Sequence, residues 1–289
     1  MKHRIRTFVI AFVLMFLVFL VWYCQDKQLL PRFIRYITED GYAERICESD
    51  PFGCTYGNKP KELFALLARG YEQFSDDLSS TISIYQVFLP IISVIGGAMF
   101  YREWNVIDKF KMHRHQSRVK TEFALMSANA TAVALGVFVA YLLTMWLCYT
   151  TAWFKKPYPG ADPYSDFLLD LIPIEFYEQH IVLYWILLGV FHFFAATWIY
   201  CLFSSAIALY CKSMKTTVLL PLSIFYGLIF ANTWLCRSFG YFMIYLNPIG
   251  ILASMVFPDR SSLLFMAFPL ATCLISMAMV KIHCDYEEI

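Results

Sequence analysis

The stretch FALMSANATAVALGVFVAYLLTMWLCYT, residues 123–150, decides the class of fold. It runs for 28 residues without an Asp, Glu, Lys or Arg. About 20 predominantly apolar residues in a helix are enough to cross the hydrocarbon core of a bilayer. The stretch therefore predicts a membrane-spanning α-helix, and the rest of the chain contains further stretches of the same kind.

The composition of the whole chain points the same way. Of its 289 residues, 59% are hydrophobic and 16% are charged, whereas a typical soluble domain is about 45–50% apolar and about 25% charged. Such a chain has too little polar surface to cover itself in water, so the predicted surroundings are the lipid bilayer. The formal net charge of +1 does not indicate a nucleic-acid partner, because such proteins usually carry an excess of basic residues.

Six stretches are long and apolar enough to predict an all-α polytopic membrane protein, with one transmembrane domain over residues 1–289. The predicted spans are 8–24, 82–101, 123–150, 181–211, 216–235 and 263–280. The first span follows a basic start and could be a cleaved signal peptide, but its apolar run is long for one and no A-x-A-like site follows it. We therefore expect an uncleaved anchor.

The basic residues predict the orientation, because Lys and Arg are enriched in short cytoplasmic loops. With the N-terminus inside, the inner segments carry 12 Lys and Arg residues, and the short outer loops carry four. We therefore expect six spans with both termini in the cytoplasm, and a location in the cell membrane.

The segment 25–81 is too polar for lipid and too long for a simple loop, so we expect a structured extracellular segment. It contains Cys47 and Cys54, with Pro51 and Gly53 marking a turn between them. Outside the cell a disulfide could close this short loop. Two free thiols are the alternative.

The segment 236–262 is too apolar for a free loop, and Asn247-Pro248-Ile249-Gly250 interrupts it in the middle. Backbone at membrane depth must have its polar groups satisfied, so this break favours a re-entrant pair of short helices. The alternative is a surface loop with an apolar interfacial face.

Polar residues within the predicted spans are few, and His192 is the clearly titratable one. An ionisable residue inside a membrane is a functional candidate by default, and the alternative for His192 is a hydrogen bond between helices. No phosphate-binding G-x-x-x-x-G-K-[ST] loop, G-x-S-x-G elbow, H-E-x-x-H pair or zinc-finger cysteine spacing is present. The sequence thus predicts no catalytic residue, metal site or cofactor in this chain.

Small residues gather at Gly96, Gly97 and Ala98 in the second predicted span. Small residues let neighbouring helices approach closely in membranes. The patch predicts a close helix contact, either within the chain or with another subunit.

The loop 102–120 carries an amphipathic pattern. Trp104, Ile107 and Phe110 repeat near helical spacing, with charged residues between them. This predicts a short helix across the cytoplasmic mouth of the second and third spans. It is either a docking helix for a soluble partner or a basic surface helix that touches anionic lipid headgroups.

Together these features resemble the membrane subunit of an ABC-2 type transporter. That family often has an acidic residue just after the second span and a Ser-Arg pair just before the third, and Glu103 and Ser117-Arg118 stand in similar places. The family's usual Gly in the middle of this loop, and its Pro before the Ser-Arg pair, are missing here.

The resemblance implies a permease that pairs with a second copy or a homologue and is moved by separate ABC ATPase subunits. The ATPase-coupling helix would then contain Glu103, Trp104, Ile107, Phe110 and Arg118. The expected activity is ATP-driven transport, in the export direction, of a peptide, lipid or hydrophobic compound. Two alternatives stay open: a polytopic membrane enzyme that uses His192, and a membrane sensor or regulatory subunit that uses 25–81.

Overall fold

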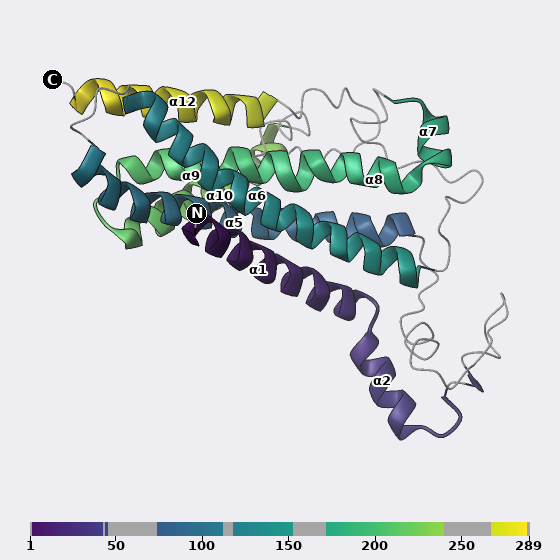
Figure 1. Cartoon of the computed structure of the whole chain (residues 1–289). Coiled ribbons are helices and arrows are strands. Elements are labelled where there is room, and N and C mark those ends of the chain that lie inside the picture. Colours follow the sequence, from purple (N-terminus) through teal and green to yellow (C-terminus); the bar gives the residue numbers. More distant parts are fainter. Residues whose placement is uncertain are drawn as a thin grey trace.

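The structure is a computed structural model, and every regular element in its described part is a helix. It describes residues 2–42, 44–45, 74–111, 118–152, 172–239 and 267–287. The helices form an elongated bundle in which most of them run along its length (Figure 1).

In the residues that the structure describes, six runs of helix make up the bundle. They are α1 (Lys2–Asp26), α5 (Phe74–Lys111), α6 (Arg118–Thr151), the continuous run of α8 (Ile181–Gly189), η1 (Val190–Ala195) and α9 (Ala196–Leu209), α10 (Met214–Phe239) and α12 (Ala267–Glu287). Two short helices, α2 (Leu29–Thr38) and α7 (Ile174–Gln179), lie at one end of the bundle (Figure 1).

Five of these passes are long and apolar enough to cross a membrane, which confirms the all-helical, multi-pass class. They cover His3–Asp26, Phe74–Asn105, Arg118–Thr151, Ile181–Leu209 and Met214–Asn232. The sixth predicted span, 263–280, overlaps α12, whose described part is not among the five. The helices run past the predicted boundaries because polar residues continue them: α5 begins eight residues before the apolar run and ends ten residues after it.

The centre of the bundle is formed by α5, α6 and α9, with α1 packed on α6, α10 on α5 and α12 on α9. Glycines mark the closest approaches. A Cβ on Gly97 would lie 2.8 Å from the carbonyl oxygen of Ser204 in α9, and one on Gly136 would lie 2.6 Å from the carbonyl oxygen of Phe8 in α1. Gly96 faces Cys201 of α9 in the same way. Both glycines of the predicted small-residue patch therefore make a contact within the chain.

A π-helical turn, η1, interrupts the fourth pass. Tyr141 of α6 packs against Gly189, where a Cβ would lie only 2.2 Å from the ring, and its hydroxyl donates to the carbonyl oxygen of Trp185 at 2.9 Å. The Tyr141 ring also stacks on Phe193 with centroids 4.1 Å apart. Single π turns inserted in α-helices often mark functional sites. At this one, Tyr141 from the neighbouring helix α6 packs against Gly189 and Phe193.

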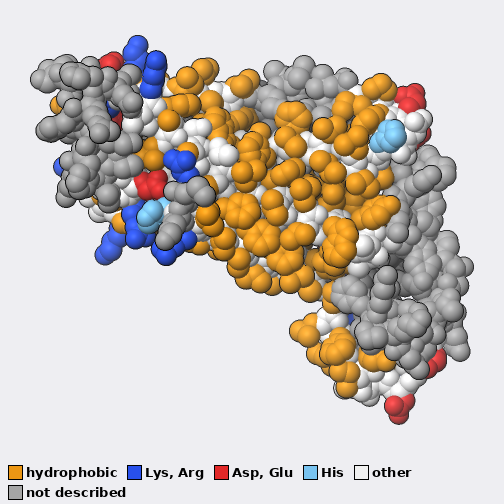
Figure 2. All heavy atoms as spheres, viewed as in Figure 1, with side chains coloured by type: hydrophobic (Ala, Val, Ile, Leu, Met, Phe, Trp, Pro, Cys, Tyr) orange, Lys and Arg blue, Asp and Glu red, His pale blue; other side chains and the backbone are white. Residues whose placement is uncertain are grey.

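The outer surface of the bundle is apolar. Figure 2 shows hydrophobic side chains over the middle of the molecule and charged side chains toward its ends. Large apolar side chains such as Trp146, Phe230 and Leu274 are well exposed. A contiguous apolar surface of this extent is typical of a membrane or partner contact.

The N-terminal end of α1 and the C-terminal end of α12 lie toward the same end of the bundle, where α5 ends and α6 begins (Figure 1). We call this the Trp104 end, after a residue near the end of α5. The opposite end, where α1 ends and α5 begins, is called the Lys27 end. The side of the membrane that each end faces stays a prediction from the basic loops.

Candidate functional site

In the described part of the chain, polar side chains form a cluster between helices at each end of the bundle. Single hydrogen bonds also join helices between the two ends, such as that from Ser204 to Ser93 at 3.1 Å. The Lys27 cluster consists of Trp22, Tyr23, Asp26, Lys27, Ser75, Asp77, Ser80, Thr151 and Tyr177. The Trp104 cluster consists of Phe100, Glu103, Trp104, Arg118, Glu122, Asn129, Tyr210, His283 and Cys284.

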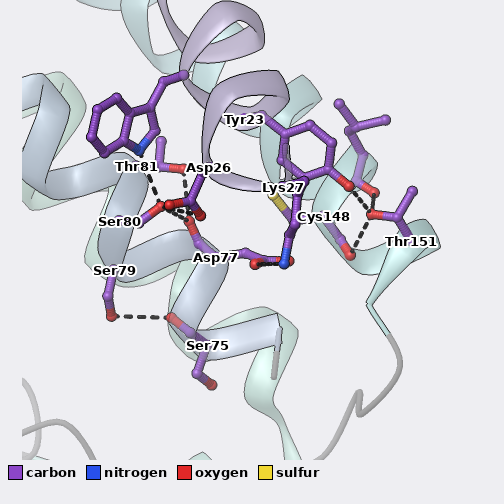
Figure 3. Close-up of polar contacts among 12 residues, drawn as sticks. Tyr23, Asp26, Lys27, Ser75, Asp77, Ser79, Ser80, Thr81, Cys148 and Thr151 are labelled. Carbon is purple, nitrogen blue, oxygen red and sulfur yellow. Dashed lines mark hydrogen bonds and ion pairs between the residues drawn. The ribbon is translucent and has the colours of Figure 1, made fainter. Parts of the chain in front are cut away.

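The Lys27 cluster is built around a buried ion pair. The ammonium group of Lys27, just past the end of α1, contacts the carboxylate of Asp77 in the first turn of α5 (Figure 3). Their side chains are 4% and 1% exposed. The N-terminus of a helix also favours a carboxylate, through its partial positive charge. Each charge thus has a compensating partner away from water, which a buried charge requires.

Hydroxyl groups extend this cluster to neighbouring helices (Figure 3). Tyr23 donates to the hydroxyl of Thr151 in α6 at 2.6 Å. Ser80 of α5 accepts from the indole of Trp22 at 3.1 Å and donates to Asp26 at 3.4 Å. These bonds join the end of α1 to both α5 and α6.

A further buried bond reaches the short helix α7, where Ser75 and Tyr177 lie 3.0 Å apart through their hydroxyl oxygens. The sequence pattern did not reveal this cluster, because Lys27 and Asp77 both fall in the segment 25–81 that its polarity assigned to the extracellular side. The sequence feature that could have indicated this cluster is Lys27, a cation that follows shortly after the first apolar span.

The Trp104 cluster is built around aromatic rings and one guanidinium group. The guanidinium carbon of Arg118 lies 5.5 Å from the centroid of the Trp104 ring, within the range of a cation–π contact. Phe100 and His283 pack against the same ring, with centroids 6.3 and 5.9 Å away. Arg118 also pairs with Glu122, at 2.9 Å from its Nε to the carboxylate. The indole of Trp104 is therefore enclosed by its own chain on several sides.

Two carboxylates connect this cluster to buried positions. The thiol of Cys284 in α12 donates to Glu122 at 3.3 Å, and the amide of Asn129 donates to Glu103 at 3.0 Å. Asn129 is completely buried and Glu122 nearly so. These contacts connect α5 with α6 and α6 with α12.

Tyr210, directly after α9, brings a fourth helix into the cluster. Its hydroxyl donates to the carbonyl oxygen of Met279 at 2.7 Å, and its ring lies 5.3 Å from that of His283. Partial burial, and then the nearby Cys284 and Glu122, raise the pKa of the Tyr210 phenol above its usual value. The hydroxyl therefore keeps its proton, and its hydrogen bond, throughout the neutral pH range.

Of the five residues predicted for the coupling helix, Trp104 and Arg118 lie against each other, and Glu103 accepts a hydrogen bond from Asn129. Ile107 and Phe110 lie on α5, and their side chains are outside the described residues. The predicted short helix is the continuation of α5 to Lys111, because no Gly or Pro interrupts residues 102–111. Residues 112–117 lie outside the described part.

Other predicted features fall on residues that the structure does not describe. These are Cys47 and Cys54 with their proposed disulfide, and the Asn-Pro-Ile-Gly break at 247–250. His192 is described and completely buried in η1, where its Nδ1 lies 3.0 Å from the carbonyl oxygen of Leu188 in the same helix. In the described part of the chain, no three His, Cys, Asp or Glu side chains are grouped so as to hold a metal ion.

The fold and its apolar surface define a class, that of multi-pass α-helical membrane proteins. Comparison with known protein families, curated proteins and solved structures found no match to this chain.

Proposed function

We propose that this chain is the membrane-spanning permease subunit of an ATP-driven ABC transporter, moved by separate ATPase subunits that bind at the Trp104 end. The observation that carries the proposal is the Trp104 cluster, which joins the described ends of four helices beside the loop 102–120. Hydrolysis of ATP would take place in the partner, and a second copy or homologue of the chain would complete the transport path. Export, and a peptide, lipid or hydrophobic cargo, are expected from the sequence resemblance alone.

Helix α5 is suited to carry a movement along the bundle. Its 38 residues span roughly 57 Å at 1.5 Å per residue, nearly twice the hydrocarbon thickness of about 30 Å. Because it runs from Asp77 in the Lys27 cluster to beyond Trp104, a force on the segment 102–111 acts on one continuous helix. The close approach at Gly97 transmits the same movement to α9.

The contacts at the Trp104 end are of kinds that tolerate a change in the relative positions of the helices. Ring–ring contacts are favourable in both offset-stacked and edge-to-face arrangements, whereas a hydrogen bond weakens steeply when its angle is bent. An ATPase that binds the loop 102–120 differently in its two nucleotide states would shift the balance between two arrangements of these helices. Such differential binding is what any ligand-driven shift requires.

The proposal is tested by site-specific photo-crosslinking in membranes of the cells that carry this chain. A genetically encoded crosslinker at the exposed Asn105 should capture a protein with a G-x-x-x-x-G-K-[ST] motif, and the yield should change when ATP and vanadate are added. The matched control is the exposed Gln25 at the opposite end, which should capture no such protein. Equal capture at both positions, or no nucleotide-binding protein at position 105 in correctly inserted chain, overturns the proposal.

A further inference from the structure

Helix α2 leaves the bundle instead of packing into it (Figure 1). It follows α1 after a two-residue turn, Lys27 and Gln28, and none of its residues is buried. Gln28 has a φ of 50°, in the left-handed region that residues other than glycine seldom adopt. The ion pair of Lys27 with Asp77 fixes the turn to the bundle, so the direction in which α2 departs is built into the fold.

The side chains of α2 divide into two faces. At 100° per residue, Leu30, Phe33, Ile34 and Ile37 share one face, and Arg35 lies on the other. The four apolar side chains are exposed, Leu30 and Ile37 by 66% and 65%. Figure 2 shows hydrophobic side chains gathered on this part of the molecule, below the main apolar surface.

The position of α2 relative to the membrane follows from α1. The spanning part of α1, His3–Asp26, has 24 residues, which extend roughly 36 Å and slightly exceed the hydrocarbon core of about 30 Å. The end of α1 therefore reaches the boundary between acyl chains and headgroups. Because α2 begins three residues later, it starts at that boundary.

We propose that α2 lies flat in the membrane interface, with its apolar face among the acyl chains and Arg35 directed to the lipid phosphates. An amphipathic helix of this kind sits about 5–10 Å into the boundary region. The preceding helix α1 also exposes apolar side chains, among them Val13, Leu17 and Val21. The guanidinium group matches the charge and geometry of a phosphate. The proposal depends on α1 crossing the membrane and not on the transport function.

The test uses the full-length protein in phospholipid vesicles, with a genetically encoded fluorescent amino acid at position 34 or at position 35. These neighbours lie 100° apart around the helix, position 34 on the apolar face and position 35 on the polar face, so each is the control for the other. Lipids with a spin label near the glycerol should quench position 34 several-fold more than position 35. Aqueous iodide should show the reverse order. Phe33→Asp with Ile37→Asp should abolish the lipid quenching at position 34, and Arg35→Gln should leave it in place.

Equal access of iodide to the two positions would show that α2 stands in water and would overturn the proposal. Protection of position 34 from both quenchers, lost when the protein is diluted in the membrane, would show that a second copy covers this face. That result also overturns the proposal. The fluorescence readout needs no transport activity, so failure of the proposed function does not affect it.

Discussion

The two ends of the bundle hold their charges in different ways. At the Lys27 end, a cation and a carboxylate are buried together, and hydroxyl groups join the surrounding helices. At the Trp104 end, Arg118 is 19% exposed in its side chain, and it lies against an indole ring as well as against Glu122. The Lys27 end is held by one buried ion pair, Lys27 with Asp77, whose two charges must stay in contact. At the other end, a pair between Arg118 and the nearly buried Glu122 is joined by ring, cation–π and hydrogen-bond contacts among four helices.

This difference indicates which end is fixed and which can adjust. Breaking a buried ion pair leaves an uncompensated charge away from water, which costs about 3–5 kcal/mol. Cation–π and ring–ring contacts contribute about 0.5–2 kcal/mol each, so one can be exchanged for another at small cost. We therefore expect the Lys27 end to be the more rigid of the two, and four experiments test that contrast.

The largest effect is expected from Asp77→Asn, which leaves the buried Lys27 without its carboxylate. The free energy of unfolding should fall by about 3–5 kcal/mol, measured by denaturant unfolding of the purified protein in detergent. The control is Glu39→Gln, which removes a pair with Arg45 that is largely exposed; such surface pairs contribute about 0–1 kcal/mol.

Removing both partners sharpens this test. The double substitution Lys27→Met with Asp77→Leu should recover most of the loss, because no unpaired charge remains buried. An Asp77→Asn protein as stable as the unchanged chain would mean that the Lys27 end is open to water. The proposed contrast between the two ends would then fail.

A smaller effect is expected from Gly97→Ala, in the middle of the helix that joins the two ends. The new Cβ would lie 2.8 Å from a backbone oxygen of α9, so the helices must move apart, at a cost of about 1–3 kcal/mol. Gly227→Ala is the matched control, because nothing lies within 4 Å of a Cβ there. Thermal unfolding of the two variants should differ, with Gly227→Ala neutral or slightly stabilising. Equal unfolding temperatures would show that α5 and α9 are loosely packed.

The third effect concerns the contact between Trp104 and Arg118. A double-mutant cycle with Trp104→Leu and Arg118→Gln should give a coupling energy of about 0.5–2 kcal/mol. A cycle with the exposed Trp146→Leu in place of Trp104→Leu should give a value near zero. A Trp104–Arg118 coupling as large as the loss from Asp77→Asn would remove the distinction between a fixed end and an adjustable end.

The sequence was informative where a single segment determines the structure. Apolar runs located five of the passes that the structure describes, because a spanning helix satisfies its backbone within itself and must face lipid with its side chains. The periodic pattern at 102–110 also singled out Trp104, and the family resemblance singled out Glu103 and Arg118. All three take part in the cluster at that end.

The sequence was uninformative where the partner is distant in the chain. His283 and Cys284 contact Trp104 and Glu122 across more than 160 positions, and no local pattern links them. Lys27 and Asp77 each read as solvated charges, because burial depends on how α1 and α5 pack. The π turn at Val190–Ala195 likewise lies next to Gly189, where α6 places Tyr141 from a distant part of the chain.

The smallest effect is expected from Tyr210→Phe at the Trp104 end. The substitution removes the hydrogen bond to the Met279 carbonyl. Because the Tyr210 side chain is about half exposed, the loss of stability near neutral pH should be about 0.5 kcal/mol, at the low end for a hydrogen bond.

The contribution of Tyr210 should also depend on pH. The folded protein raises the pKa of this phenol, so the folded state retains the proton at pH values where the unfolded chain, whose tyrosine pKa is about 10, releases it. The stability that Tyr210 contributes is therefore complete below that value and is lost as the pH rises above it. Unfolding measured from pH 7 to 11 should show the advantage over Tyr210→Phe shrinking at the alkaline end. An advantage that grows with pH would contradict the environment assigned to Tyr210.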